Sequence, residues 1–572
     1  MSKQKHLISS ALPYINGVKH LGNLIGSMLP SDVYARFLRA QGHQVVFVCA
    51  TDDHGTPAEI AALKANQPVA EYCAEQHDIQ KGIYERFGIS FDHFGATSRK
   101  PNHDITQRIA RELWHNGMFE VKTIKQVYSK ADNRFLPDRY VEGTCPHCGY
   151  TKARGDQCEN CTRVLDPTDL INPRSAISGS TDLEVRETAH AFLRLSTMAD
   201  KLRTWVGEQK DWAPLTRSIA LKWLDEGLHD RGMTRDLKWG VPVPAEFGPE
   251  FEGKVFYVWF DAPIGYIGAT AEWAEKIGKP NEWEKWWLNA KDVRYTEFMG
   301  KDNVPFHTII FPAMLMGASE PWKLVDNIKS FSWMTYYGGK FSTSSRHGVF
   351  TDQALEILPN PDYWRYYLLA RAPESDDSSF TWDDFQAVVN KDLADVLGNF
   401  VNRTLQLTSR NFGNKMPAFG NPQPADMACA EKLNNILARY TTHLERIELR
   451  KAVEALRELW VTGNEYLASQ EPWQVVKTDK DRAASILNIA CGMMVMYAHA
   501  MRPIIPFTAD KILALFSNPE SLLKDPAQTW PSSLSIMKPG QLEFTLPTEV
   551  LFPKITDEQR AEWEARFGNT KA

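Results

Sequence analysis

The pattern of hydrophobic and polar positions changes along the chain and divides it into several parts. In the first hundred or so residues, strand-like and helix-like runs alternate. Leu7–Ile8 leads into the loop Ala11–Gly17, and a helix is expected from near Gly22 through Leu38. The run Val45–Cys49 is almost wholly apolar, as expected of a parallel strand covered on both faces. Because ligands bind beyond the carboxyl ends of such strands, the polar loop at 51–55 is a candidate site by its position alone.

A different residue pattern begins at residue 117 and continues to 225. Turn residues and cysteines crowd together there, and the alternation of strands and long helices stops. We interpret this stretch as an insertion that splits the sheet. An apolar pattern returns at Val255–Phe260, and a helix is expected near Phe311. The sheet is therefore predicted to be completed after the insertion.

Beyond Phe385 the chain is predicted to be helical. Apolar residues fall on one face of a first helix (Leu393, Val396, Leu397, Phe400, Val401 and Leu405) and mark a second helix (Val453, Leu456 and Trp460). The run Ala483–Met501 comes nearest to a membrane span, but Asn488 and His499 interrupt it, which favours a buried bundle helix. A strand-like stretch follows only at Leu542–Leu546.

These patterns predict six segments. The two halves of an α/β domain occupy 1–116 and 226–330, on either side of the insertion at 117–225. A linking segment at 331–385, a helical bundle at 386–550 and a tail at 551–572 follow. A chain of 572 residues is too long for one hydrophobic core, which agrees with this division.

Composition narrows the class of protein. With 43% hydrophobic and 24% charged residues, the chain is typical of soluble globular proteins. A net charge of −6 excludes a body coated in positive charge, but local basic patches can still bind one structured RNA. The first residues carry no secretory signal, and the cysteines do not form a disulfide framework. We therefore expect a cytoplasmic protein that does not enter a membrane.

Four of the eight cysteines form one spaced cluster, Cys145-x2-Cys148-x9-Cys158-x2-Cys161. Two Cys-x2-Cys turns can each present two thiolates to one ion, and four thiolates make a closed tetrahedral zinc site. Two redox pairs would need thioredoxin-like strands and helices, which the surrounding pattern lacks. The sequence thus predicts one structural Zn²⁺.

Two polar segments are candidates for phosphate binding. His20–Asn23 fits a loop that enters a helix, whose N-terminus offers free N–H groups to an anion; simple helix capping is the alternative. Lys340–Ser344 follows Gly338-Gly339 and precedes Arg346. A glycine pair before a lysine, several hydroxyls and an arginine can close on a polyphosphate, and an ordinary polar hairpin is the alternative.

Together, the two polar segments and the cysteine cluster resemble the methionyl-tRNA synthetase family of class I aminoacyl-tRNA synthetases. HLGN at His20–Asn23 is similar to the first class I signature, and KFSTS at Lys340–Ser344 to the second. Further matching segments are Ala11–Tyr14, Asp52–Pro57, Tyr257–Tyr266, and Gly300–Asp302 with His307. The resemblance runs from about Leu7 past Trp473. It implies a Rossmann-like class I α/β catalytic domain, split by the zinc-knuckle insertion and followed by an α-helical anticodon-binding bundle.

The resemblance also implies a role for each matching residue. L-Methionine would be bound by Leu12, Tyr14, Asp52, Trp259, Ala262, Pro263, Tyr266 and His307, with Asp52 on the ammonium group. ATP, with Mg²⁺, would be bound by His20, Gly22, Asn23, Asp302, Lys340 and Thr343, of which His20, Asn23 and Lys340 would be catalytic. The anticodon of tRNA(Met) would be bound by Arg410, Asn464 and Trp473. The chain is expected to be a monomer.

Two positions depart from the family's usual pattern. Asn23 replaces the second histidine of the commonest first signature, although asparagine also donates hydrogen bonds. Thr343 stands at the family's usual second lysine and carries no charge, and Arg346 is a candidate to replace that lysine.

The reaction implied by the resemblance has two steps. The carboxylate of methionine attacks the α-phosphate of ATP, and the terminal ribose of tRNA then attacks the adenylate. Synthetases for leucine, isoleucine, valine or cysteine are alternatives within the class. The first three carry a large editing insertion, for which this chain has no room, and the cysteine enzyme uses a catalytic zinc. A homologue that only binds RNA is the alternative that Thr343 favours.

Overall fold

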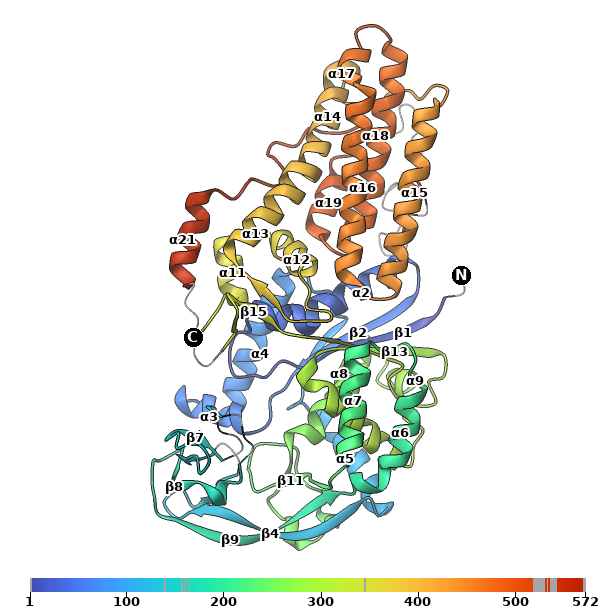
Figure 1. The fold of residues 1–572 in the computed structure, drawn as a ribbon. Helices are drawn as coiled ribbons and strands as arrows, with labels where there is room; N and C mark the ends of the chain where they lie inside the picture. The colour runs from blue at the N-terminus through green and yellow to red at the C-terminus, as the bar shows by residue number, and fades with distance from the viewer. Residues whose placement is uncertain are drawn as a thin grey trace.

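The computed structural model has an α/β body with the insertion at one end and a helical bundle at the other (Figure 1). The structure describes residues 3–568 apart from 138–139, 156–157, 159, 162, 164, 344–345, 518–529, 532 and 535–542. Ser344, the last residue of the predicted KFSTS loop, lies outside the described residues.

The central sheet has five parallel strands in the described part of the chain. Their order is β14 (Asn327–Phe331), β13 (Val293–Gly300), β1 (Lys5–Ser10), β2 (Gln44–Thr51) and β3 (His93–Ala96). Because every strand is parallel to its neighbours, all the carboxyl ends lie at one edge of the sheet.

Helices cover both faces of this sheet. Neighbouring residues of β1 face different cores: Ile8 packs with α2 (Leu29–Ala40) and α4 (Val69–Arg86), and Leu7 packs with α5 (Lys100–His115) and α8 (Val258–Lys276). This burial on both faces explains the continuous apolar run of β2. The predicted helix from Gly22 to Leu38 is confirmed as α1 (Leu21–Asn23), the π-helical segment η1 (Leu24–Met28) and α2.

The apolar run Val255–Phe260 does not continue the sheet, so that interpretation was wrong. Only β12 (Val255–Phe256) is extended, and it pairs antiparallel with β11 (Thr234–Arg235), outside the central sheet. Val258 already begins α8, most of which is buried. Periodicity cannot separate a buried helix from a buried strand in so short a run. The sheet is completed by β13 and β14, and Arg294, Thr296 and Glu297 break the apolar pattern of β13.

The insertion is built around a long hairpin-like pair of strands. β4 (Phe119–Ser129) and β9 (Leu183–Leu193) pair antiparallel along their whole length, and β5 (Arg134–Phe135) and β10 (Arg231–Gly232) flank them. A smaller sheet, β6 (Val141–Thr144), β7 (Ala153–Arg154) and β8 (Ile171–Ser175), borders the cysteine cluster. α6 (Ala199–Glu208) and α7 (Pro214–Glu226) then lead back to the catalytic body (Figure 1).

A compact linking region joins the catalytic body to the bundle. β15 (Met334–Tyr336), β16 (Gly339–Lys340) and β17 (Ser378–Phe380) form a small sheet. α11 (Thr351–Ile357), α12 (Pro361–Ala370) and α13 (Trp382–Val389) pack beside it. Residues 551–572, predicted as a tail, include α21 (Asp557–Phe567), which packs on this region through Trp563 and Trp382.

The C-terminal part is helical, as predicted. Its helices are the π-helical η9 (Asn390–Gly398), α14 (Asn399–Phe412), α15 (Pro424–Glu445), α16 (Leu449–Gln470), α17 (Pro472–Val475), α18 (Lys480–Met501) and α19 (Pro506–Ala514). In the described residues, α18 is the helix long and apolar enough to cross a membrane, and its apolar window is 100% buried within the molecule. This confirms the bundle-helix interpretation. At Leu542–Leu546, Leu542 lies outside the described residues, and Glu543 and Phe544 form isolated bridges.

Candidate active site

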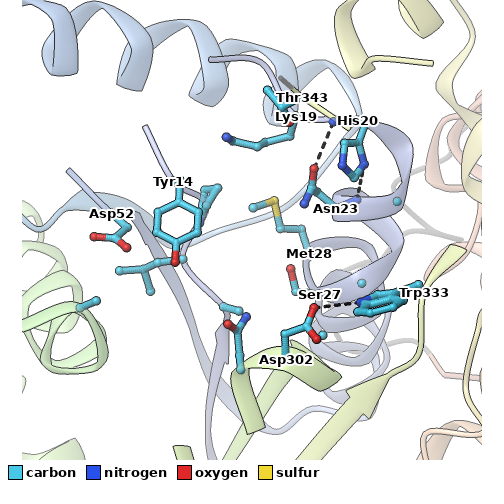
Figure 2. A pocket seen from close by; sticks show the side chains of 18 of the residues that line it. Tyr14, Lys19, His20, Asn23, Ser27, Met28, Asp52, Asp302, Trp333 and Thr343 are labelled. Carbon is cyan, nitrogen blue, oxygen red and sulfur yellow. Dashed lines mark hydrogen bonds between the residues drawn. The ribbon is translucent and has the colours of Figure 1, made fainter. Parts of the chain in front are cut away.

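A cavity of about 710 Å³ lies at the carboxyl ends of the central strands. Loops after four strands contribute to it: Tyr14 follows β1, Asp52 follows β2, Asp302 follows β13, and Trp333 follows β14 (Figure 2). Every residue predicted to bind methionine or ATP lines this cavity. The structure therefore brings together segments that are more than three hundred positions apart in the sequence.

One end of the cavity has aromatic walls. Trp259, near the start of α8, stacks on Phe306 with ring centroids 3.5 Å apart, and Tyr14 meets Trp259 edge-on at 6.4 Å. Aromatic and apolar walls suit a polarisable thioether. Sequence reasoning missed Phe306; its place next to His307 was the available signal.

His307 is fixed by two hydrogen bonds in this wall. Its Nδ1 lies 2.8 Å from the backbone oxygen of Asn303 and must donate there, so Nε2 accepts from the Tyr266 hydroxyl at 2.8 Å. Burial lowers the pKa of His307 to about 4, which keeps the ring neutral. The pair therefore presents polar groups without charge to the apolar end.

Asp52 supplies a buried carboxylate beside this pocket. Its side chain is only 4% exposed, and its Oδ1 has no hydrogen-bond partner among the described residues. Burial, with Asp261 and Asp53 nearby, raises the pKa of Asp52 well above its usual value. An unpaired, buried carboxylate oxygen is destabilised unless a cationic ligand group binds it.

The opposite end of the cavity is the helix start at His20. His20 Nδ1 accepts a hydrogen bond from the Asn23 backbone N–H at 3.2 Å, and Asn23 Oδ1 accepts from the His20 backbone N–H at 3.3 Å (Figure 2). Both side chains thus cap the helix, as in the alternative interpretation. A phosphate bound at this helix start would take the place of these capping contacts. Burial lowers the pKa of His20 to about 3, so its ring is neutral.

The KFSTS loop closes over this helix start. Phe341 stacks on His20 with ring centroids 4.9 Å apart. A Cβ at Gly22 would lie 3.2 Å from the Phe341 ring and 3.1 Å from His20 Nδ1, which explains the glycine. Sequence reasoning missed Phe341 because an aromatic residue in a polar loop carries no phosphate-binding signal.

Trp333 lies between two charged residues at the rim of the cavity, Asp302 and Lys340. Its indole Nε1 donates to the Asp302 carboxylate at 2.9 Å, and the Lys340 Nζ lies 3.7 Å from its ring centroid. No sequence motif pointed to Trp333. Arg346 is exposed and does not line the cavity, whereas Thr343 does.

The cysteine cluster has the geometry of a tetrahedral sulfur site. The Sγ atoms of Cys145 and Cys161 are 3.8 Å apart, and those of Cys148 and Cys158 are 3.6 Å apart. All four sulfurs lie within 4.8 Å of one another. Zinc–sulfur bonds of about 2.3 Å in a tetrahedron require sulfurs about 3.8 Å apart. The cluster therefore fits one metal ion with no open position.

The residues predicted to bind the anticodon lie in the bundle. Trp473, on α17, is half-buried, and the Arg403 guanidinium lies 5.0 Å from its ring centroid. Asn464, on α16, donates to the backbone oxygens of Val396 and Trp460, and its own buried Oδ1 has no partner among the described residues. Arg410 is exposed on α14.

Figure 1 shows α17, the helix that carries Trp473, at the end of the bundle far from the central sheet. Sequence reasoning missed Arg403. Its spacing of seven residues from Arg410 on one helix was the signal, since that spacing returns to the same face.

Comparisons with known proteins match the whole chain. The family described as "tRNA synthetases class I (M)" matches residues 6–405, and "Anticodon binding domain of methionyl tRNA ligase" matches residues 416–572. Methionine–tRNA ligases are 57% identical in Streptomyces avermitilis and 56% in Cereibacter sphaeroides, each covering 99% of both chains. Mycobacterium tuberculosis methionyl-tRNA synthetase in complex with methionyl-adenylate has a TM-score of 0.76 at 25% identity, covering 96% of this chain and 100% of its own.

Proposed function

The chain belongs to the class I methionyl-tRNA synthetases, and we propose that its cavity forms methionyl-adenylate from L-methionine and ATP before the methionyl group passes to tRNA(Met). The observation that carries this proposal is the joining of two chemically different ends in one cavity. An aromatic pocket suits a thioether side chain, and a helix start beside a lysine suits a polyphosphate.

Methionine is bound at the aromatic end. Its thioether lies between Trp259 and Tyr14, within reach of the Tyr266–His307 pair, and Leu12, Ala262 and Pro263 close the walls. Asp52 binds the ammonium group, because its buried Oδ1 lacks a partner among the described residues.

ATP is bound at the helix start, together with Mg²⁺. His20 and Asn23 hold phosphate oxygens at the start of α1, in place of their capping contacts, and Gly22 leaves room for the nucleotide. Asp302 binds the ribose, while Lys340 and Thr343 face the phosphates from the KFSTS loop.

The first step needs no proton transfer. An oxygen of the methionine carboxylate forms a bond to the α-phosphorus, and the bond to the β-phosphate oxygen breaks, so pyrophosphate leaves with that electron pair. The residues named here align the two substrates and stabilise negative charge, which are the main sources of acceleration in such reactions.

Outside the cavity, we propose three further assignments. Cys145, Cys148, Cys158 and Cys161 bind one structural Zn²⁺, supported by their sulfur spacing. Trp473, Asn464 and Arg410 contact the anticodon, supported by the exposure of Arg410 and by the Asn464 Oδ1, which has no hydrogen-bond partner among the described residues. The chain acts as a cytoplasmic monomer that does not enter a membrane, divided into the six segments predicted from the sequence.

Exchange of pyrophosphate into ATP, run with each of the twenty amino acids, tests the proposal. We expect exchange that depends on methionine, and much weaker exchange with homocysteine, which lacks one methyl group. Apolar pockets discriminate by only about 1–3 kcal/mol per methylene, so homocysteine should remain detectable. Full exchange with leucine, isoleucine, valine or cysteine, or none with any amino acid, would refute it.

A further inference from the structure

The proposed first step gathers negative charge where the two substrates meet. A carboxylate approaches the α-phosphate of a polyphosphate, and more charge develops on the phosphate oxygens as pyrophosphate leaves. A cavity that accelerates this step needs positive groups placed at that junction. The neutral rings of His20 and His307 cannot supply them.

Two lysines are the only lysine or arginine side chains among the described residues that line the cavity. Lys340 is exposed, at the rim, over the ring of Trp333. Lys19 is the other, and it is only 5% exposed. Thr343, in the KFSTS loop, also lines the cavity but is uncharged. The buried interior of the cavity therefore has a single cation to offer in the part of the chain that the structure describes.

Lys19 lies between the two substrate ends. It directly precedes His20, and its ammonium group interacts electrostatically with Asp52. Its Nζ donates to the Asn16 side-chain oxygen at 2.8 Å, and no carboxylate among the described residues forms an ion pair with it. Figure 2 shows the side chain running from the His20 end of the cavity toward the Tyr14 end. A lysine with a single neutral partner in a buried site keeps donors available for an anion.

The backbone around Lys19 is attached to the segment that follows the KFSTS loop. The backbone oxygen of Lys19 accepts hydrogen bonds from the Thr351 N–H at 2.9 Å and from its hydroxyl at 2.8 Å. The next residues continue the contact, since the Leu21 N–H donates to the Val349 oxygen at 3.1 Å. Backbone hydrogen bonds thus hold Lys19 beside the segment that follows the KFSTS loop, and both Lys19 and the loop line the cavity.

We propose that Lys19 is a catalytic residue, whose ammonium group binds the α-phosphate as the methionine carboxylate attacks it and supplies the charge that Thr343 lacks. This rests on the proposed function of the cavity. When the ammonium group of methionine binds Asp52, it neutralises the carboxylate that attracts Lys19. The phosphate then becomes the counter-ion of Lys19. Burial lowers the pKa of Lys19 to about 7, against the opposing effect of Asp52, and a bound polyphosphate favours the charged form.

The decisive variant is Lys19→Met, which removes the charge and keeps the length of the side chain. Single-turnover adenylate formation should slow roughly 100- to 1,000-fold, as when one positioned donor is lost from a charge-developing site. Methionine affinity should change far less, and transfer to tRNA from supplied methionyl-adenylate should be normal, since both avoid the attack on the α-phosphate. Lys329→Met is the control: this lysine is mostly buried and does not line the cavity, so adenylate formation should stay near the wild-type rate.

A second substitution distinguishes the loss of positive charge from a loss of correct folding. In the Lys19→Met background, Thr343→Lys should restore at least about tenfold of the lost rate, because it places a cation in the same cavity. A wild-type rate from Lys19→Met would overturn the proposal. So would an equal loss in methionine binding, adenylate formation and transfer, or a folded double variant with no recovery. Failure of the proposed function would differ, since the wild-type enzyme itself would then show no methionine-dependent exchange.

Discussion

Arg365 donates a hydrogen bond to the Asp32 carboxylate at 2.7 Å, and neither side chain is exposed to solvent. The same guanidinium donates to the backbone oxygens of Phe87, Pro503 and Ile504. Asp32 and Phe87 belong to the catalytic body, Arg365 to α12, and the two other oxygens to the end of the bundle. One buried cation therefore joins three regions of the molecule.

Replacing Arg365 with methionine should destabilise the protein by about 3–5 kcal/mol, because Asp32 would be left buried without its main partner. Burial alone would raise the pKa of Asp32, but Arg36, Arg365 and two hydrogen bonds from Ser90 lower it to about 2. This is below the value of about 3.9 in an unfolded chain, so the stabilisation is present above that pH and is lost as pH falls through about 2.

Urea unfolding at neutral pH measures the effect of Arg365→Met. Arg36→Met is the matched control, because Arg36 also binds Asp32 at 2.9 Å but its side chain is 20% exposed. We expect a clearly smaller loss from the control. Equal, small losses from both variants would show that the buried pair does not connect the three regions.

Methionine binding should weaken on acidification. Burial, then Asp261 and Asp53, raise the pKa of Asp52, so this carboxylate takes up a proton at a higher pH than usual. A protonated Asp52 cannot pair with the substrate ammonium, so the methionine KM should rise as pH falls, starting at a higher pH than an ordinary aspartate would require. Lys19, which faces Asp52, gains charge as pH falls through about 7, so the ATP KM should not rise with it.

The measurement is pyrophosphate exchange at varied pH, with both Michaelis constants determined. Asp52→Asn should raise the methionine KM at every pH and remove its pH dependence. His20 and His307, with pKa values of about 3 and 4, stay neutral at neutral and mildly acidic pH. A parallel rise in both constants would argue against the role of Asp52.

Trp259→Ala should raise the methionine KM by roughly 10- to 100-fold, equivalent to about 1–3 kcal/mol of lost apolar contact. The ATP KM should move much less, because Trp259 stacks with Phe306 at the aromatic end. Trp273→Ala is the control, as Trp273 lies on the same helix α8 but does not line the cavity. If the methionine and ATP constants rose equally, Trp259 would be a packing residue only.

Purified protein should contain one zinc per chain, measured by elemental analysis without chelators. Cys158→Ser should abolish zinc and unfold the small sheet of the insertion locally, because such sites contribute about 10–16 kcal/mol of apparent binding free energy. Cys429→Ser, which replaces a buried cysteine of the bundle, should keep the metal. Protein without zinc, or full zinc in Cys158→Ser, would exclude the four-cysteine site.

Trp473→Ala should lower kcat/KM for tRNA by roughly 10- to 100-fold, as expected for about 1–3 kcal/mol from one stacked base. Adenylate formation should be intact, because the first step does not need tRNA. Trp460→Ala is the contrast: Trp460 is fully buried in the bundle, so its loss should cost about 3–5 kcal/mol of stability. If Trp473→Ala lost stability in the same way and impaired both steps, Trp473 would be a core residue.

Much of the cavity could be predicted from sequence because its residues lie in short local segments. Tyr14, Asp52 and Asp302 each follow a strand, and parallel strands place their carboxyl ends at one edge. The cysteine spacing, likewise, is local chemistry: four thiolates at that spacing have few alternatives to a metal. Helices of the bundle were predictable because apolar residues fall on one face of each, and residues such as Leu397 and Leu456 are buried in the structure.

Long-range packing decided the rest, because no local pattern encodes it. The run at Val255–Phe260 contains the short strand β12 and the start of α8 instead of a strand of the central sheet, against which α8 packs. Trp333 and Phe341 reach the cavity through the linking region, and neither has a sequence signal for ligand binding. The family and the four-cysteine cluster could be identified from the sequence alone, because short local motifs carry both. The tertiary structure decided which side chains become buried partners, such as Arg365 and Lys19, since desolvation and long-range contacts set their charge and their neighbours.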